Sequence, residues 1–284
     1  MEPLEAHVLF VGRDGRFAVG VIDEIDGKYV QTQSDFGMAP GWTHVVAVGP
    51  HILFVGNDLD EQAYAVGHID QETSHFVETD SGTGMAKGWS HIVAVGPHIL
   101  FVRNNAAGTY AVGHINETDG HFVETQQGKG MAPDWTHVVA VGPHILFVRK
   151  KDGRFAVGHI DLSKGHFVAT QDGTLVDPKS STVFTGAAHV VAVRSHVLLG
   201  RDDAFEVGHI DEANSQWVPT QGPGPGVGGF PDPMHVVAVG PHVLGVSPTR
   251  TAGFVLHINQ SGQFVETETG PDFASDWTHV VAVA

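Results

Sequence analysis

The 284-residue chain contains no cysteine, which excludes a disulfide framework and all thiol chemistry. Charged residues make up only 17% of the sequence, and 15 Lys and Arg residues face 32 Asp and Glu residues. The net charge of −17 argues against nucleic acid and anionic membrane surfaces as partners, because both attract positive charge. No apolar run is long enough to span a bilayer.

The opening residues, MEPLEA, are acidic and lack the apolar centre of a secretory signal peptide. Together with the missing cysteines, this predicts a cytoplasmic protein. The chain has enough apolar residues for a full core, since 42% of its residues are hydrophobic. Histidine is unusually abundant, because its 20 copies exceed Lys and Arg together.

A short apolar segment, HVVAV or HIVAV, recurs along the chain at intervals of 44 to 52 residues. The histidines that open it are His44, His91, His137, His189, His235 and His279. A turn, usually Gly-Pro, leads to a second segment such as HILFV, and segments such as FAVGHID and HFVET complete the unit. These segments are short, rich in Val, Ile, Phe and Thr, and bounded by turn residues, which is typical of β-strands.

Six units of four strands predict an all-β protein, a six-bladed β-propeller with four antiparallel strands per blade. We expect one domain over residues 1–284. The last copy, WTHVVAVA, stops after its first strand, and the chain begins with the missing second to fourth strands, HVLFV, FAVGVID and KYVQTQ. The two ends are therefore predicted to pair in one blade and close the ring. A solenoid is the alternative, but neither end offers the distinct capping repeat that it needs.

In such a fold the first strand of each blade lines the central channel, so the six histidines that open first strands should form a ring at one mouth. Imidazole suits Zn, Cu, Fe and Ni, and three or more of these rings could hold such an ion. No carboxylate occupies the equivalent position, which argues against calcium. The alternatives are binding of an anion or water, or a scaffold role repeated in every blade.

The loops from fourth to first strands are of two kinds. Four have equal length and carry a tryptophan two residues before the ring histidine; these are Trp42, Trp89, Trp135 and Trp277. Three of the four share the sequence GMA. The loops at 171–188 and 221–234 are longer, lack that tryptophan, and contain Phe184 and Phe230. Such aromatic rings can stack on a sugar or fill the gap between blades.

The average repeat of 47 residues, the tryptophan-bearing loops and the absence of cysteine resemble the tachylectin and tectonin group of propeller lectins over the whole chain. The resemblance implies a carbohydrate-binding protein, but no sugar-binding motif transfers residue by residue. We therefore expect a lectin-like protein that binds a glycan or another small molecule through the Trp and Phe residues above, between blades or at the channel mouth.

The alternative is a single-site enzyme of the cyclase, lyase or hydrolase type, or a metal-binding protein, with its site at the histidine ring under the two long loops. Its candidate catalytic residues are His189, His235, Glu206 and Asp232. Glu206 replaces a small residue on a third strand, and Asp232, like Asp177, lies in a long loop. Against an enzyme, no phosphate-binding glycine loop, serine elbow or recurring carboxylate pair is present.

Overall fold

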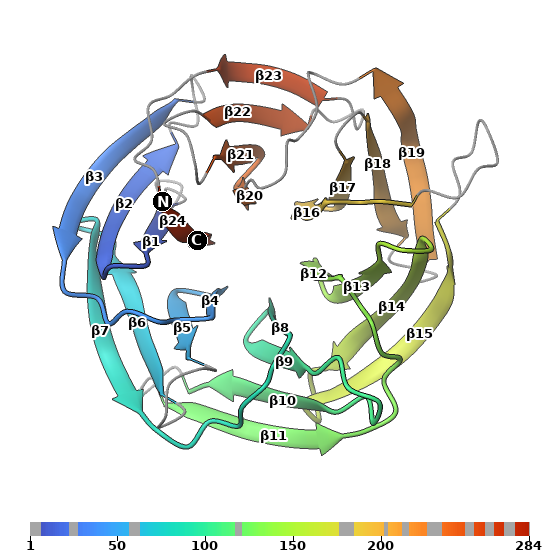
Figure 1. Cartoon of the computed structure of the whole chain (residues 1–284), viewed down its shortest axis with the longest axis horizontal. Coiled ribbons are helices and arrows are strands. Elements are labelled where there is room, and N and C mark those ends of the chain that lie inside the picture. Colours follow the sequence, from blue (N-terminus) through green and yellow to red (C-terminus); the bar gives the residue numbers. More distant parts are fainter. Residues whose placement is uncertain are drawn as a thin grey trace.

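The computed structural model describes residues 7–22, 28–56, 63–116, 121–175, 185–201, 204–211, 216–225, 235–247, 253–258, 264–269 and 276–283. These residues form six four-stranded antiparallel sheets arranged as a ring around a central channel (Figure 1). We number the sheets as blades I to VI in chain order, with the first strand of each blade innermost.

Blade I consists of β24 (Trp277–Val283), β1 (His7–Gly12), β2 (Arg16–Ile22) and β3 (Tyr29–Phe36). Blade II consists of β4 (His44–Val48), β5 (His51–Val55), β6 (Tyr64–Asp70) and β7 (His75–Gly82). Blade III consists of β8 (His91–Val95), β9 (His98–Val102), β10 (Tyr110–Ile115) and β11 (Phe122–Gly128).

Blade IV consists of β12 (His137–Val141), β13 (His144–Arg149), β14 (Arg154–Asp161) and β15 (His166–Thr174). Blade V consists of β16 (His189–Val193), β17 (His196–Arg201), β18 (Ala204–Asp211) and β19 (Gln216–Pro225). Blade VI consists of β20 (His235–Val239), β21 (His242–Val246), β22 (Gly253–Ile258) and β23 (Phe264–Thr269).

The ring closes in blade I, where strands from the two ends of the chain pair. β1 runs antiparallel to β24, with His7 opposite Val283 and Val11 opposite His279. The first and last described strands of the chain, β1 and β24, therefore lie side by side near the channel (Figure 1). The predicted six-bladed propeller and its closure by paired termini are confirmed.

Glycine fixes the turn that joins the first and second strands of a blade. In blade II this loop has two residues, because Val48 pairs with His51 across Gly49 and Pro50. Gly49 has a φ of 56°, which glycine adopts without strain and which starts a type II′ hairpin turn. The equivalent residue in blade V is Arg194, whose φ of 55° is a conformation that non-glycine residues rarely adopt.

A β-bulge recurs where the third strand of a blade pairs with the fourth. In blade III, Gly113 pairs with Glu124 but Val112 pairs with Gln126, so Thr125 is the extra residue. The hydroxyl of Thr125 donates to the carbonyl oxygen of Val112 at 3.1 Å, and the corresponding threonines of blades I, II, IV and V make the same bond. The bulge interrupts the strict alternation of side chains along the outer strand.

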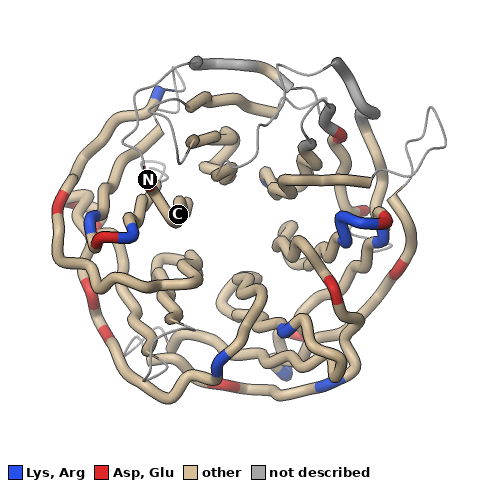
Figure 2. Tube along the Cα trace, viewed as in Figure 1, with Lys and Arg blue, Asp and Glu red and all other residues tan. Residues whose placement is uncertain are grey.

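The hydrophobic core of the described residues is divided among the junctions between neighbouring blades. Large and small side chains alternate across the paired second and third strands, as where Phe101 pairs with Ala111. In blade VI the order is reversed, because Gly245 pairs with Phe254. The first strands carry no Lys, Arg, Asp or Glu, and the charged residues lie farther from the channel (Figure 2). No helix in the described part of the chain could cross a membrane.

Candidate functional site

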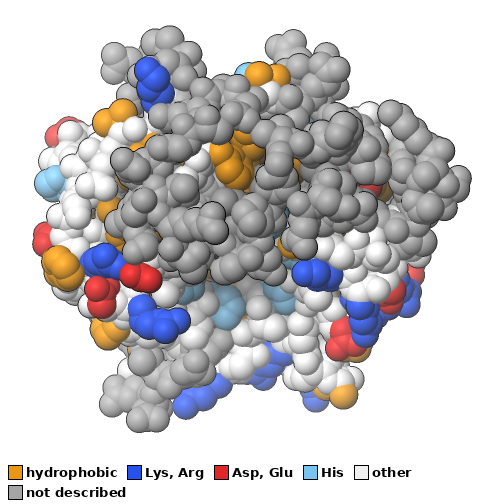
Figure 3. All heavy atoms as spheres, turned by 45° about the horizontal axis from the view of Figure 1, so that its top comes forward, with side chains coloured by type: hydrophobic (Ala, Val, Ile, Leu, Met, Phe, Trp, Pro, Cys, Tyr) orange, Lys and Arg blue, Asp and Glu red, His pale blue; other side chains and the backbone are white. Residues whose placement is uncertain are grey.

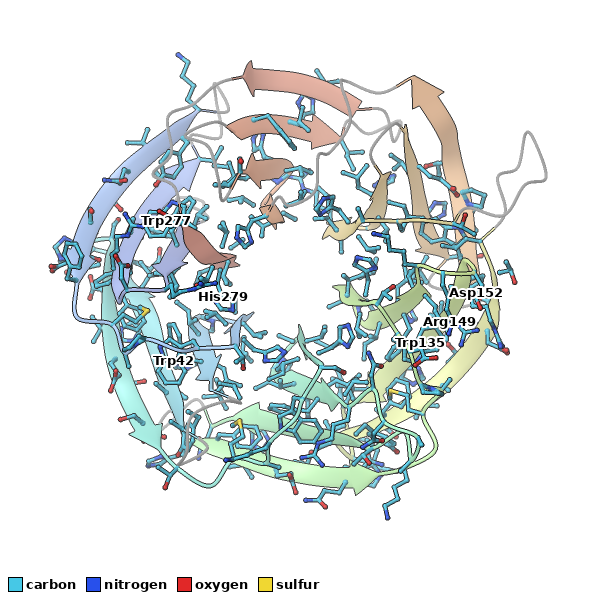
Figure 4. All side chains as sticks on the ribbon, viewed as in Figure 1. Trp42, Trp135, Arg149, Asp152, Trp277 and His279 are labelled. Carbon is cyan, nitrogen blue, oxygen red and sulfur yellow. The ribbon has the colours of Figure 1, made fainter. Side chains whose placement is uncertain are left out.

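The six histidines that open the first strands form what we call the histidine collar, at one mouth of the channel: His44, His91, His137, His189, His235 and His279. All six are half-buried. In Figure 4 the labelled His279 lies at the edge of the channel, and in Figure 3 pale blue histidine side chains are visible in the middle of the face shown. The predicted ring of histidines is therefore present.

Collar imidazoles bind the backbone of the next blade. The Nε2 atom of His137 donates to the carbonyl oxygen of Ala188 at 3.0 Å, and Nε2 of His235 donates to the carbonyl oxygen of Trp277 at 2.9 Å. The same kind of bond joins His44 to Ser90, His91 to Thr136 and His279 to Thr43. The corresponding neighbour of His189, residue 234, lies outside the described residues.

The second ring nitrogen of four collar histidines lies beside a hydroxyl of its own blade. Nδ1 of His137 is 3.2 Å from Oγ1 of Thr136, and His44, His91 and His279 have the same contact at 3.1 Å with Thr43, Ser90 and Thr278. The hydroxyl of Thr136 also donates to the carbonyl oxygen of Val148 at 3.0 Å. Nε2 carries the proton that binds the neighbouring carbonyl oxygen, so Nδ1 of the neutral imidazole is an acceptor and shares the hydroxyl proton with the carbonyl oxygen of Val148.

This arrangement bears on the predicted metal site. Burial lowers the pKa of His44, His91, His137 and His279 below the usual 6.5, and charge repulsion from neighbouring collar histidines adds to this effect at His44, His137 and His279. The bonded nitrogens face the channel wall. Among the described residues, which include the whole collar, no three His, Asp or Glu side chains are grouped so that they could hold a metal ion. The described residues thus show no metal site at this mouth, and the six histidines as metal ligands stay a prediction.

Three similar pockets lie at the junctions between blades I and II, II and III, and III and IV. Their volumes are about 330, 440 and 570 Å³, respectively. We name them by their tryptophans: the Trp42, Trp89 and Trp135 pockets. Each is covered by the loop that connects one blade to the next, and that loop leads directly into a collar histidine. The pockets therefore share the face of the collar but lie away from the channel.

The walls of the three pockets come from the same positions of the repeat. In the Trp135 pocket, Tyr110 comes from the preceding blade, and Phe147, Ala156 and Phe167 come from the following blade. Phe or Tyr, Phe, Ala and Phe occupy these positions in the other pockets: Phe17, Phe54, Ala65 and Phe76 in one, and Tyr64, Phe101, Ala111 and Phe122 in the other. Each pocket also contains a methionine of the GMA loop, Met38, Met85 or Met131.

The tryptophan forms the inner wall of each pocket. Trp89 and Trp135 are only 6% and 5% exposed, whereas Trp42 is half-buried. Each packs on the second-strand phenylalanine of its blade, with ring centroids 5.4 to 5.6 Å apart. Trp277 packs in the same way on Phe10 at 5.4 Å, and residues 270–275 of its loop lie outside the described chain. Figure 4 shows Trp42, Trp135 and Trp277 at the blade junctions, outside the channel.

Glycines and left-handed residues shape the loops over the pockets. The first residue of each GMA sequence has a positive φ of 94° to 119°. The residue just before each tryptophan is also left-handed: Gly41, Gly88, Asp134 and Asp276. The backbone N–H of Met131 donates to the carbonyl oxygen of Gly108 at 3.1 Å, and Met38 makes the same bond to Gly15. These bonds fix the loop on the hairpin of the preceding blade.

Polar side chains lie at the rims of the pockets. Glu124 and Gln127 line the Trp89 pocket, and Gln127 donates to Glu124 at 2.7 Å. Gln33, Asp35 and Glu78 line the Trp42 pocket. Each pocket thus combines half-buried aromatic rings with amide or carboxylate groups, which is the chemistry of a site for a small polar ligand.

Comparison with known proteins supports the fold but does not show a function. No protein-family model matches the chain, and no curated protein matches it in sequence. Solved structures do match. A putative 6-phosphogluconolactonase from Bacteroides fragilis is 11% identical, with 99% of each chain covered and a TM-score of 0.62. The periplasmic gluconolactonase of Pseudomonas aeruginosa is 12% identical, with 98% of this chain and 99% of that chain covered and a TM-score of 0.63. The likeness to tachylectin-type lectins stays a prediction.

The candidate residues of the single-site alternative are only partly described. Phe184, Phe230, Asp232 and Asp177 lie outside the described residues. Glu206 lies on β18 and is fully buried. It occupies the position of the pocket-lining alanines Ala65, Ala111 and Ala156 in the other blades. His189 and His235 belong to the collar.

Sequence reasoning missed most of the pocket walls and rims. The tyrosines, the outer-strand phenylalanines and the rim carboxylates were not predicted as site residues. The repeated HFVET segment was the available signal, because it brings an aromatic and a carboxylate to the same place in successive blades. Its strand position was clear, but its contact with the tryptophan loop of the same junction required the fold.

Proposed function

We propose that this protein is a lectin-like binding protein that holds saccharides in the pockets between its blades. The observation that carries the proposal is the repetition of one aromatic pocket, with a polar rim, at three successive junctions. Aromatic faces accept the apolar C–H face of a sugar ring, while amides and carboxylates bind its hydroxyl groups. Pockets of about 330 to 570 Å³ are large enough for a monosaccharide or disaccharide unit.

In this proposal the buried tryptophans support the sites from within. Tyr64, Phe76, Tyr110 and Phe122 are half-buried and present more ring surface than Trp89 and Trp135 do. Phe36 is 71% exposed at the rim of the Trp42 pocket. These rings are the proposed stacking surfaces.

The test is a glycan-array screen followed by calorimetric titration of a bound saccharide. We expect more than one saccharide per chain. Ala39, Ala86 and Ala132 are exposed and occupy the same position in the three pockets. Replacing any one of them by Trp should fill its pocket and remove one site. Leu162→Trp, at a 62% exposed position outside the pockets, is the matched control. A single site, or a stoichiometry that the three variants leave unchanged, contradicts the proposal.

One observation favours a second function, a hydrolase with a single site. Glu206 places a fully buried carboxylate where four other blades have alanine. Solved structures of similar fold include one gluconolactonase and two putative 6-phosphogluconolactonases. The test is hydrolysis of gluconolactone and 6-phosphogluconolactone by the wild-type protein and Glu206→Ala. Turnover above the spontaneous rate that the variant loses supports this function, and turnover equal in both proteins opposes it.

A further inference from the structure

The three pockets differ in charge, although their aromatic walls agree. Three cationic side chains line the Trp135 pocket: Lys129, Arg149 and Arg154. No cation lines the Trp42 or Trp89 pocket. The contrast is notable in a chain with a net charge of −17, because a basic site in an acidic protein is not explained by composition.

A second difference also makes the Trp135 pocket less acidic than the other two pockets. Glu78 and Glu124 line the Trp42 and Trp89 pockets from the outer strand of the following blade. The equivalent residue of blade IV is Ala169, because the segment HFVET is replaced by HFVAT at residues 166–170. The Trp135 pocket therefore has cations that the other two pockets lack and an alanine in place of the glutamate that they share, while its own carboxylate, Asp172, is paired with Arg154.

The cations of this pocket are not fully neutralised by acidic neighbours. Arg149 is held by Asp152 in a two-bond fork, with N–O distances of 2.9 and 2.6 Å (Figure 4). Arg154 and Asp172 form a more open pair at 3.5 Å, with exposed fractions of 52% and 77%. Within the described chain, Lys129 forms no ion pair, and its side chain is exposed. Lys129 and Arg154 can therefore meet an anion that enters the pocket.

We propose that the Trp135 pocket binds a sugar that carries an anionic substituent, whereas the Trp42 and Trp89 pockets bind neutral sugars. The inference rests on the proposed saccharide-binding function and assigns a ligand class to one of its sites. The aromatic wall takes the sugar ring, and Arg154 with Lys129 binds the charged group. A guanidinium fork matches the geometry of a carboxylate or a sulfate, so both substituents belong to the class.

The rims of the other two pockets oppose such a ligand. Glu124 lies beside Gln127 at the Trp89 pocket, and Asp35 and Glu78 line the Trp42 pocket. A carboxylate or sulfate placed there meets a like charge and finds no cation in the lining. This repulsion restricts the charged sugar to one junction.

The experiment uses sugars in matched sets: a hexose-terminated oligosaccharide, its hexuronate counterpart and its sulfated counterpart. Calorimetric titration of the full-length protein should show one site per chain that prefers a charged member by about tenfold or more, and added salt should weaken that preference. The hexuronate and sulfate arms show which anionic group is bound.

Two matched substitutions test the assignment. Ala169→Glu restores the carboxylate of the other pockets at an exposed position, and Arg154→Thr installs the residue found at the equivalent Thr109. Each should lower the affinity for the charged sugar about tenfold and leave binding of the neutral sugar at the Trp42 and Trp89 pockets unchanged. Glu124→Ala, in the Trp89 pocket, should leave the charged-sugar site unaffected.

The outcomes separate this inference from the proposed function. If neutral sugars bind at several sites, but no charged sugar is preferred or both variants bind it as wild type does, the inference is wrong and the proposed function stands. If none of the sugars binds, both are wrong. If Ala132→Trp removes the charged-sugar site alone, that site is the Trp135 pocket. If the charged sugar still binds to this variant, the assignment is wrong.

Discussion

At the channel mouth, the collar histidines bond to the backbone of the next blade and to a hydroxyl of their own blade. At the blade junctions, the same repeat leaves cavities of hundreds of cubic ångströms with polar groups along their rims. The collar residues lie close around one axis, and both ring nitrogens of His44, His91, His137 and His279 have partners within the wall. The junctions widen away from the axis and leave room for a ligand. In this molecule, therefore, the repeated collar residues bond within the wall, and the repeated junctions leave candidate sites.

The largest expected effect comes from removing a tryptophan that supports a pocket. Trp135→Ala deletes a 5% exposed ring packed on Phe147, and should lower the free energy of unfolding by about 3–5 kcal/mol. Trp42→Ala should cost less, because Trp42 is half-buried. Urea denaturation followed by circular dichroism measures both. A loss below about 1 kcal/mol for Trp135→Ala would show that the ring is not a structural support.

The next effect tests the collar as scaffold. His137→Ala removes the bond to Ala188 in the next blade and should cost about 1–3 kcal/mol of stability, because the carbonyl loses a buried partner. His166→Ala, at an exposed position that opens an outer strand, is the control and should change stability by less than about 0.5 kcal/mol. Elemental analysis of the same protein, purified without a metal column, tests the alternative. One transition-metal ion per chain, lost in His137→Ala, would make the collar a metal site.

Acid should weaken the collar before it affects the pockets. Burial lowers the native pKa of His44, His91, His137 and His279 below 6.5, whereas these histidines titrate near 6.5 in the unfolded chain. As the pH falls below 6.5, the unfolded chain therefore binds more protons than the native protein does. The stability contributed by the neutral collar histidines is fully present above pH 6.5 and is lost as the pH falls through their lowered native pKa. The midpoint of urea denaturation should fall as the pH is lowered from 7.5 to 5. It should fall less steeply in His137→Gln than in the wild-type protein. A flat profile would contradict the role of these histidines.

The smallest expected effect on stability comes from the pocket rim. Gln127→Ala removes an exposed hydrogen bond to Glu124 and should change the free energy of unfolding by less than about 0.5 kcal/mol. Saccharide binding at the Trp89 pocket should nevertheless weaken. A large loss of stability in this variant would show that the rim supports the fold and would remove the contrast with the collar.

The sequence was sufficient for the architecture because short segments rich in Val, Ile, Phe and Thr, bounded by turn residues, recur in the same order six times. It also predicted the histidine ring, since a residue that opens every inner strand must recur around the axis. It left metal site and scaffold open. The partners of His137, for example, are a hydroxyl next to it and a carbonyl 51 residues away, which the sequence alone does not bring together.

The pockets, too, were only partly predicted from the sequence. The tryptophan loops were recognised from their equal length, but their half-buried partners, such as Tyr110 and Phe167, were not. A bulge at Thr125 shifts the alternation of the outer strand, and Glu124 and Gln127, three residues apart, are thereby brought together. Strict alternation would have placed these two residues on opposite faces.

By itself, then, the sequence determined the number of blades, the four-stranded unit and the closure through the termini, because these follow from local patterns repeated six times. Only the tertiary structure decided which repeated residues became scaffold and which became candidate sites. That choice depends on contacts between neighbouring blades, where Trp135 meets Phe147 and where Arg154 and Ala169 line one pocket. Such contacts join residues from separate strands and loops, and their geometry is set by the packing of whole sheets.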